Sequence, residues 1–133
     1  MAFTRVSSIS GDQPPFEYYL LTDAEGATIG EALVQTNGRL TKCPATSVPE
    51  FIAVKTRVAE ATSVTPLPVI RTKETDSFAT TAAVTVASTL VGSKVTLETD
   101  GLSVTATTTS GVFEISYTDG VTNGGVVHGY FRR

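Results

Sequence analysis

The chain has 133 residues, of which 41% are hydrophobic and 17% are charged, and its formal net charge is −3. This length favours one domain that buries about two-thirds of its unfolded surface, enough for a core without metals or disulfides. Apart from Arg132-Arg133 there is no basic cluster, which argues against a nucleic-acid partner. No apolar run approaches the ~18 residues of a membrane helix, and the first residues lack the apolar core of a signal peptide, so we expect no membrane partner.

The first segment, residues 1–15, ends in two prolines, which cannot donate hydrogen bonds to a neighbouring strand. We therefore predict an extended N-terminal arm outside the sheet, followed by a single β domain over residues 16–133. Phe3, Val6 and Ile9 place an apolar side chain at every third position, which suits an arm that docks on a partner. A frayed terminus is the alternative interpretation.

Residues 16–21 form a dense apolar run that predicts the first strand of the domain. The run is closed by the turn-like residues 23–26. Within it, Phe16, Tyr18 and Tyr19 join the three apolar residues of the arm as candidate contacts with a partner protein or a neighbouring copy.

The dipeptide Asn37-Gly38 predicts a β-hairpin, because a type I′ turn needs positive φ at both central residues. The flanking residues 31–36 and 39–43 are then two antiparallel strands. Their register stays open, since Leu33 and Leu40 do not fall opposite each other across a two-residue loop.

Further strands are predicted along the rest of the chain. Residues 51–54 form one, and residues 66–71, which are entered through proline, predict a strand at the edge of a sheet. Residues 80–90 fit either a strand or a connection, and residues 126–131 predict the last strand. Abundant threonine and valine support the same all-β class.

The clearest pattern lies in residues 94–117, which predict three strands joined by two tight turns. Asp100-Gly101 is the stronger turn signal, and a two-residue loop there places Leu97 opposite Val104. In the same register Val104 faces Ile115 across the second turn, and the apolar residues share one face. The sequence thus predicts an all-β fold, a compact antiparallel barrel or sandwich, with a C-terminal meander.

Few residues suggest catalysis. His128 is the single histidine and Cys43 the single cysteine, so neither a multi-histidine metal site nor a disulfide can form within the chain. A nucleophile pair of these two is formally possible, but a histidine alternating along a strand is better explained by the sheet. Residues 23–26 lack the helices of a calcium-binding EF-hand. The dispersed carboxylates leave an opposed acid pair open, because pairing depends on the fold; they are Glu98, Asp100, Glu114 and Asp119. We expect a protein that is not an enzyme and needs no cofactor.

Three stretches carry a resemblance to a known family. The first is Gly30-Glu31-Ala32-Leu33-Val34 with Asn37-Gly38-Arg39-Leu40-Thr41-Lys42-Cys43, an opening hairpin. The second is residues 49–54 followed by 67–71, and the third is residues 94–97, 100–109 and 111–115. Together, over residues 29–131, they resemble the decoration or cement proteins of tailed-bacteriophage heads.

This resemblance implies a compact β-fold on the outer surface of the virion, made in the host cytoplasm and bound to the major capsid protein. It implies a homotrimer at local three-fold positions that stabilises the mature shell, with no catalytic residue. The alternative is a β-sandwich recognition module that binds carbohydrate or a host surface. Four tyrosines would supply its stacking rings: Tyr18, Tyr19, Tyr117 and Tyr130. An enzyme is the third hypothesis.

Overall fold

The computed structural model describes residues 2–9, 11, 14–120 and 124–132. Ten strands and one short 3-10 helix follow each other along the described chain. They are β1 (Thr4–Ser8), β2 (Phe16–Tyr19), β3 (Ala32–Thr36), β4 (Arg39–Lys42), β5 (Phe51–Ala53), β6 (Leu67–Arg71), β7 (Asp76–Thr81), η1 (Ser88–Leu90), β8 (Lys94–Val95), β9 (Phe113–Thr118) and β10 (Val126–Phe131). No helix of the described residues is long and apolar enough to cross a membrane.

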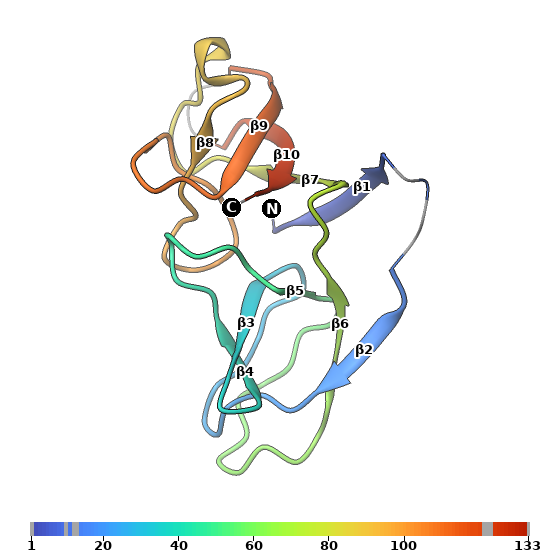
Figure 1. Cartoon of the computed structure of the whole chain (residues 1–133). Coiled ribbons are helices and arrows are strands. Elements are labelled where there is room, and N and C mark those ends of the chain that lie inside the picture. The colour runs from blue at the N-terminus through green and yellow to red at the C-terminus, as the bar shows by residue number, and fades with distance from the viewer. Residues whose placement is uncertain (1, 10, 12–13, 121–123, 133) are drawn as a thin grey trace.

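The strands form two five-stranded antiparallel sheets that pack together, and the all-β prediction is confirmed. The first sheet has the order β1-β7-β10-β9-β8 and the second has the order β2-β6-β5-β3-β4. Figure 1 shows them as the upper and lower halves of the molecule. Because the sheets are not closed into a barrel, the sandwich is the correct member of the two predicted architectures.

Two hydrophobic cores hold this arrangement. The larger lies between the sheets and includes Phe78 and Phe113 from the first sheet, with Ala32 and Ile52 from the second. The smaller covers the opposite face of the second sheet, where Leu33 and its neighbours on β5 and β6 point. Since successive residues of a strand point to opposite faces, the centre of the second sheet is covered on both sides, whereas its edge strand β2 is not.

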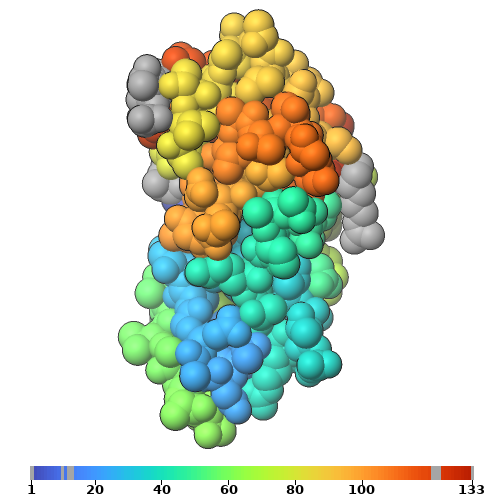
Figure 2. All heavy atoms as spheres, turned by 90° about the vertical axis from the view of Figure 1, so that its left-hand side faces the viewer, coloured from blue at the N-terminus to red at the C-terminus, as the bar shows by residue number. Residues whose placement is uncertain are grey.

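Backbone hydrogen bonds also join the halves on the side away from β1 and β2. Ala32 N–H donates to Gly101 O over 2.8 Å, and Leu97 N–H donates to Ala45 O over 2.9 Å. Figure 2 shows this side, on which the two halves are in direct contact. The junction is therefore fixed by polar bonds as well as by the apolar core.

The N-terminal segment is not the predicted free arm. Its strand β1 pairs with β7, and Phe3 is only 3% exposed within the core between the sheets. The prediction was wrong because the two prolines lie after β1 and leave its hydrogen bonds intact. Residues 1, 10, 12 and 13 of the predicted arm lie outside the described residues.

The hairpin at residues 36–39 follows the prediction. Asn37 and Gly38 have φ values of 52° and 78°, as a type I′ turn requires. The pairing of Thr36 with Arg39 settles the register with a two-residue loop.

The meander differs from its prediction. Leu97 does bridge Val104, but β9 pairs with β8 and β10 rather than with residues 102–107. The middle segment is drawn away because Ala83 N–H donates to Val104 O. At the turn, Leu102 N–H donates to the Asp100 carboxylate, and Gly101, but not Asp100, has a positive φ, so the turn is not type I′.

Strand β6 was predicted at an edge but lies inside the second sheet, between β2 and β5. Its Pro68 is tolerated there because its carbonyl accepts from Val54 N–H just beyond the end of β5. Pro68 lacks an N–H only at a position where the pairing of β6 with β5 already ends, so few hydrogen bonds of the sheet are lost.

We expect Phe3→Ala to lower the free energy of unfolding by about 3–5 kcal/mol, because it leaves a cavity between the sheets. Val6→Ala, at a residue that is 48% exposed, should change it by less than about 0.5 kcal/mol. Urea unfolding monitored by tyrosine fluorescence measures both. Equal small effects would show that the N-terminal segment contributes nothing to the core.

Candidate interaction surface

The described structure places two edge strands, β1 and β2, on the same side of the molecule (Figure 1). Four of the six predicted contact residues are exposed there: Val6 by 48%, Ile9 by 69%, Phe16 by 58% and Tyr18 by 61%. We call these four residues the edge surface. Phe3 and Tyr19 do not belong to it. Large apolar side chains that remain in water along two edges are typical of a protein contact site.

The β1 part of the edge surface is shaped by a bulge. The pairing of β1 with β7 shifts between Arg5 and Ser7, so Val6 is displaced outward. Arg5 lies 3.5 Å from the carboxylate of Asp76, which is completely buried. Ile9 N–H donates to Thr75 O over 2.9 Å, which holds the chain beside β7 to that point.

The β2 part is set by an ion pair on its other face. Both nitrogens Nε and Nη2 of Arg71 donate to the Glu17 carboxylate, over 3.0 and 2.9 Å. The hydroxyl of Tyr19 donates to the same carboxylate over 2.6 Å, while its ring packs against Phe51. The hydrogen bonds from Arg71, first, and Tyr19 hold the pKa of Glu17 below its ordinary value. Tyr19 is thus engaged within the fold, whereas Phe16 and Tyr18 point to the opposite face.

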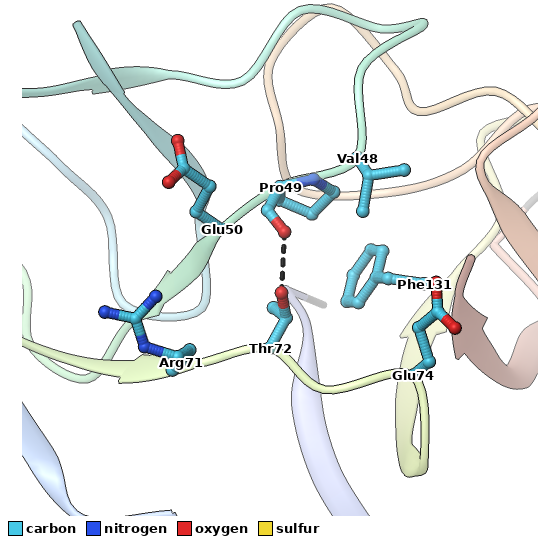
Figure 3. A pocket seen from close by; sticks show the side chains of 7 residues that line it. All are labelled: Val48, Pro49, Glu50, Arg71, Thr72, Glu74 and Phe131. Carbon is cyan, nitrogen blue, oxygen red and sulfur yellow. Dashed lines mark hydrogen bonds between the residues drawn. The ribbon is translucent and has the colours of Figure 1, made fainter. Parts of the chain in front are cut away.

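A cavity of about 380 Å³ lies where the two sheets meet. Thr72 donates from its hydroxyl to Pro49 O over 2.6 Å across it (Figure 3). The cation in its wall, Arg71, is bound to Glu17 and stacks 4.8 Å from the Phe51 ring centre. No sequence pattern predicts this cavity, because its walls come from distant segments. The lining residues are Val48, Pro49, Glu50, Arg71, Thr72, Glu74 and Phe131.

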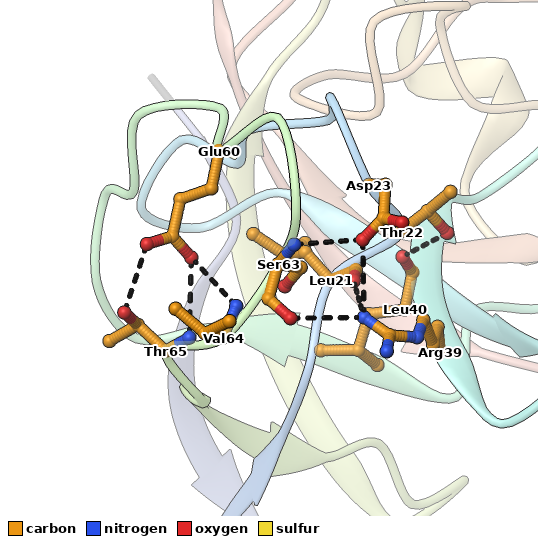
Figure 4. A network of polar contacts seen from close by, with 9 residues as sticks. All are labelled: Leu21, Thr22, Asp23, Arg39, Leu40, Glu60, Ser63, Val64 and Thr65. Carbon is orange, nitrogen blue, oxygen red and sulfur yellow. Dashed lines mark hydrogen bonds and ion pairs between the residues drawn. The ribbon is translucent and has the colours of Figure 1, made fainter.

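Residues 23–26 form a structural turn within a polar network (Figure 4). The Asp23 carboxylate accepts from Ser63 N–H over 2.8 Å and lies 3.5 Å from Arg39. The Glu60 carboxylate accepts from the backbone of Val64 and Thr65, which closes the next loop. Among the described residues no group of three or more His, Cys, Asp or Glu side chains could hold a metal ion.

Three of the four dispersed carboxylates named from the sequence also have structural partners. Glu114 pairs with Arg132 over 3.0 Å, and the Asp119 carboxylate accepts from Val126 N–H over 3.0 Å. Asp100 accepts within its own turn. The described contacts therefore tie these three acids to separate turns and strands rather than to one another.

Cys43 and His128 lie in different environments. The Cys43 thiol is buried in the core, and its sulfur lies 3.3 and 3.2 Å from the carbonyl oxygens of Pro44 and Ser47, which share its one S–H donor. Burial, with a smaller effect from Glu50, raises its pKa to about 12. His128 projects from the outer face of β10, since burial alternates along the strand and Val127 and Phe131 occupy the inner face. The two side chains do not form a nucleophile pair.

The four tyrosines considered for sugar stacking divide into two pairs. Tyr18 and Tyr117 are the exposed ones, and Tyr117 makes an edge contact with the His128 ring. Tyr19 packs on Phe51, and the Arg132 guanidinium lies 4.7 Å above the Tyr130 ring. The exposed rings belong to different sheets, so they do not line one sheet face.

No model of a known protein family matches the chain, and no curated protein matches it with significant similarity.

We expect Glu17→Gln to lower the free energy of unfolding at neutral pH by about 0.5–1 kcal/mol, since the pair with Arg71 is partly exposed. Because the folded-state pKa of Glu17 lies below its ordinary value, this contribution is complete above the ordinary pKa. It is lost as the pH falls through the folded-state pKa. Urea unfolding from pH 7 to pH 3 measures the difference. The exposed Glu74→Gln is the control, and a difference that does not change with pH would contradict the assignment.

We expect Cys43 to react with a thiol reagent only when the protein unfolds, because its thiolate is scarce and its sulfur is buried. Mass spectrometry after iodoacetamide treatment at pH 8, with and without denaturant, measures this. Fast modification of the folded protein would show that the core opens locally around residue 43.

Proposed function

We propose that this protein is a structural capsid decoration protein, which binds the outer surface of a phage head and stabilises the lattice of the major capsid protein. The observation that carries the proposal is the edge surface, and above all its β1 part. Val6 and Ile9 are exposed there, although the pairing of β1 and the hydrogen bond from Ile9 N–H to Thr75 O fix this segment to the body of the protein. A rigid strand that presents apolar side chains loses little entropy on binding.

The resemblance and the edge surface occupy different parts of the chain. The stretches that resemble decoration proteins correspond to the strands from β3 to β6, with β8 and β9, which make up much of the sandwich. The edge surface lies on residues 6–18, which that resemblance does not cover. We infer that the sandwich is the part common to such proteins, and that the edge surface is specific to this chain and to the capsid lattice that it binds.

A cement protein that binds through several copies needs only a small binding energy from each contact. Two exposed apolar residues contribute little per copy, but a trimer that engages three sites at once multiplies the effect. We adopt the homotrimer and the virion surface from the resemblance as parts of the proposal. Bound copies would then resist expansion of the shell by linking neighbouring capsid subunits.

The test is co-sedimentation of the purified protein with mature, undecorated shells. We expect saturable pelleting at a fixed ratio to the major capsid protein, with greater heat resistance of the shells. The double variant Val6→Ser/Ile9→Ser should bind at least about tenfold more weakly, because it removes apolar area from the contact. The matched control, Val58→Ser/Val64→Ser, changes two exposed valines in other loops and should bind normally.

Equal binding by both double variants would remove the β1 part of the edge surface from the contact. If the folded wild-type protein stays in the supernatant, the decoration role is wrong. The recognition module then takes its place, and binding to a glycan array, with a Tyr18→Ala and a Tyr117→Ala variant, tests that role.

A further inference from the structure

The strand β2 has one open edge. On one side it pairs with β6. On the other side β4 lies just beyond its end, where Leu40 N–H donates to Leu20 O over 2.9 Å and Thr22 N–H donates to Leu40 O over 2.9 Å. Backbone groups of alternate residues in an antiparallel strand point to the same side. The N–H and C=O groups of Tyr18 and Phe16 therefore point to the side of Leu20, which β4 no longer covers.

The edge of β2 carries neither a bulge nor a lysine, two features that commonly protect an edge. β1, the neighbouring edge strand, is interrupted by its bulge, whereas β2 has a regular register through all four residues and no lysine. The side chains of Phe16 and Tyr18 are exposed beside the open backbone groups. Within the described residues no hydrogen bond outside the sheet reaches the backbone of either residue. An extended strand is the partner that such an edge accepts.

We propose that β2 pairs with β2 of a second copy, antiparallel and about a two-fold axis beside Glu17. In this register Phe16 lies opposite the partner's Tyr18, and Tyr18 opposite the partner's Phe16. Four backbone hydrogen bonds form, and both pairs of exposed aromatic rings are covered. The two copies use the same patch, as a closed two-fold contact requires.

The neighbouring registers are excluded by the chain itself. Pairing Phe16 with the partner's Phe16 would place Tyr18 opposite Pro14, which has no N–H to donate. Pairing Tyr18 with the partner's Tyr18 would place Phe16 opposite Leu20, whose carbonyl already accepts from Leu40. The Phe16–Tyr18 register leaves none of these edge groups without a partner.

The charges beside the two-fold axis do not prevent this pairing of two copies. The two Glu17 side chains come to lie opposite each other on the second face, and like charges there oppose pairing. Each carboxylate, however, is bound by Arg71 through Nε and Nη2. The two carboxylates that face each other are therefore each already paired with a cation, which weakens their mutual repulsion. This contact does not depend on the proposed function, and a two-fold pair is separate from the three-fold arrangement expected on a shell.

The test is sedimentation velocity on the purified protein over a concentration series up to about 1 mM. We expect a reversible monomer–dimer equilibrium for the wild type. Tyr18→Pro removes an N–H that points to the open edge and costs no hydrogen bond within the sheet, so it should fold. Phe16→Lys adds a charge of the kind that protects edges. Each should weaken dimerisation by at least about tenfold.

The matched control is Ile29→Lys, because Ile29 is 57% exposed and Phe16 is 58% exposed. It should dimerise like the wild type, and circular dichroism with a melting curve confirms that each variant is folded. A wild type that stays monomeric throughout overturns the proposal. So does unchanged dimerisation of the two folded β2 variants, or an equal loss in the control. If a trimer forms that these variants do not affect, the copies meet elsewhere.

Discussion

The packing of four phenylalanines between the sheets is the interaction on which the rest of the structure depends. Phe3, Phe78 and Phe113 each contact Phe131, with ring centres 5.0, 5.1 and 5.1 Å apart. These rings come from the start of the chain, from two inner strands and from the last strand. Tilted aromatic pairs of this kind add about 0.5–1.5 kcal/mol each beyond the area they bury. Both ends of the chain are therefore fixed in the core.

The same packing explains a glycine in the last strand. A side chain at Gly129 would collide with the carbonyl of Glu114 and would lie 2.7 Å from the Phe113 ring. The β9–β10 pairing is irregular at this point, where the register shifts between His128 and Gly129. Because residue 129 is glycine, the backbone of β10 lies close to β9 there, and Phe131 reaches the other rings.

The sequence predicted turns and strands well where local chemistry decides them. Asn37-Gly38 forms its type I′ turn because both residues accept a positive φ and nothing distant competes. Asp100-Gly101 carries the same signal, but residues 102–104 are hydrogen-bonded to β7 and to Ala83, and the turn takes another form. β7 itself was missed over most of its length, since Asp76 and Ser77 look like loop residues. They are buried only because β1 and β10 cover them from both sides.

The six candidate contact residues also divide into those whose environment local sequence can indicate and those placed by distant contacts. Val6, Ile9, Phe16 and Tyr18 are exposed, as residues available for contact must be. Within β2, strict alternation could have set Tyr19 apart from Phe16 and Tyr18, because successive side chains point to opposite faces. No local signal could have shown that Phe3 enters the core. Its partners Phe113 and Phe131 lie more than a hundred residues away along the chain.

A sandwich of two open sheets has four edges, and this chain treats each differently. β8 is only two residues long, and β1 carries a bulge. The edge of β4 is partly covered, because Leu40 forms a bridge with Leu21 just after β2. Each of these features discourages a foreign strand from pairing. Of the four edge strands, as far as their residues are described, β2 is the one with open backbone groups and exposed aromatic side chains beside them. Among the described strands, β2 combines an open backbone edge with exposed aromatic side chains, and this is why the association that we propose is placed there.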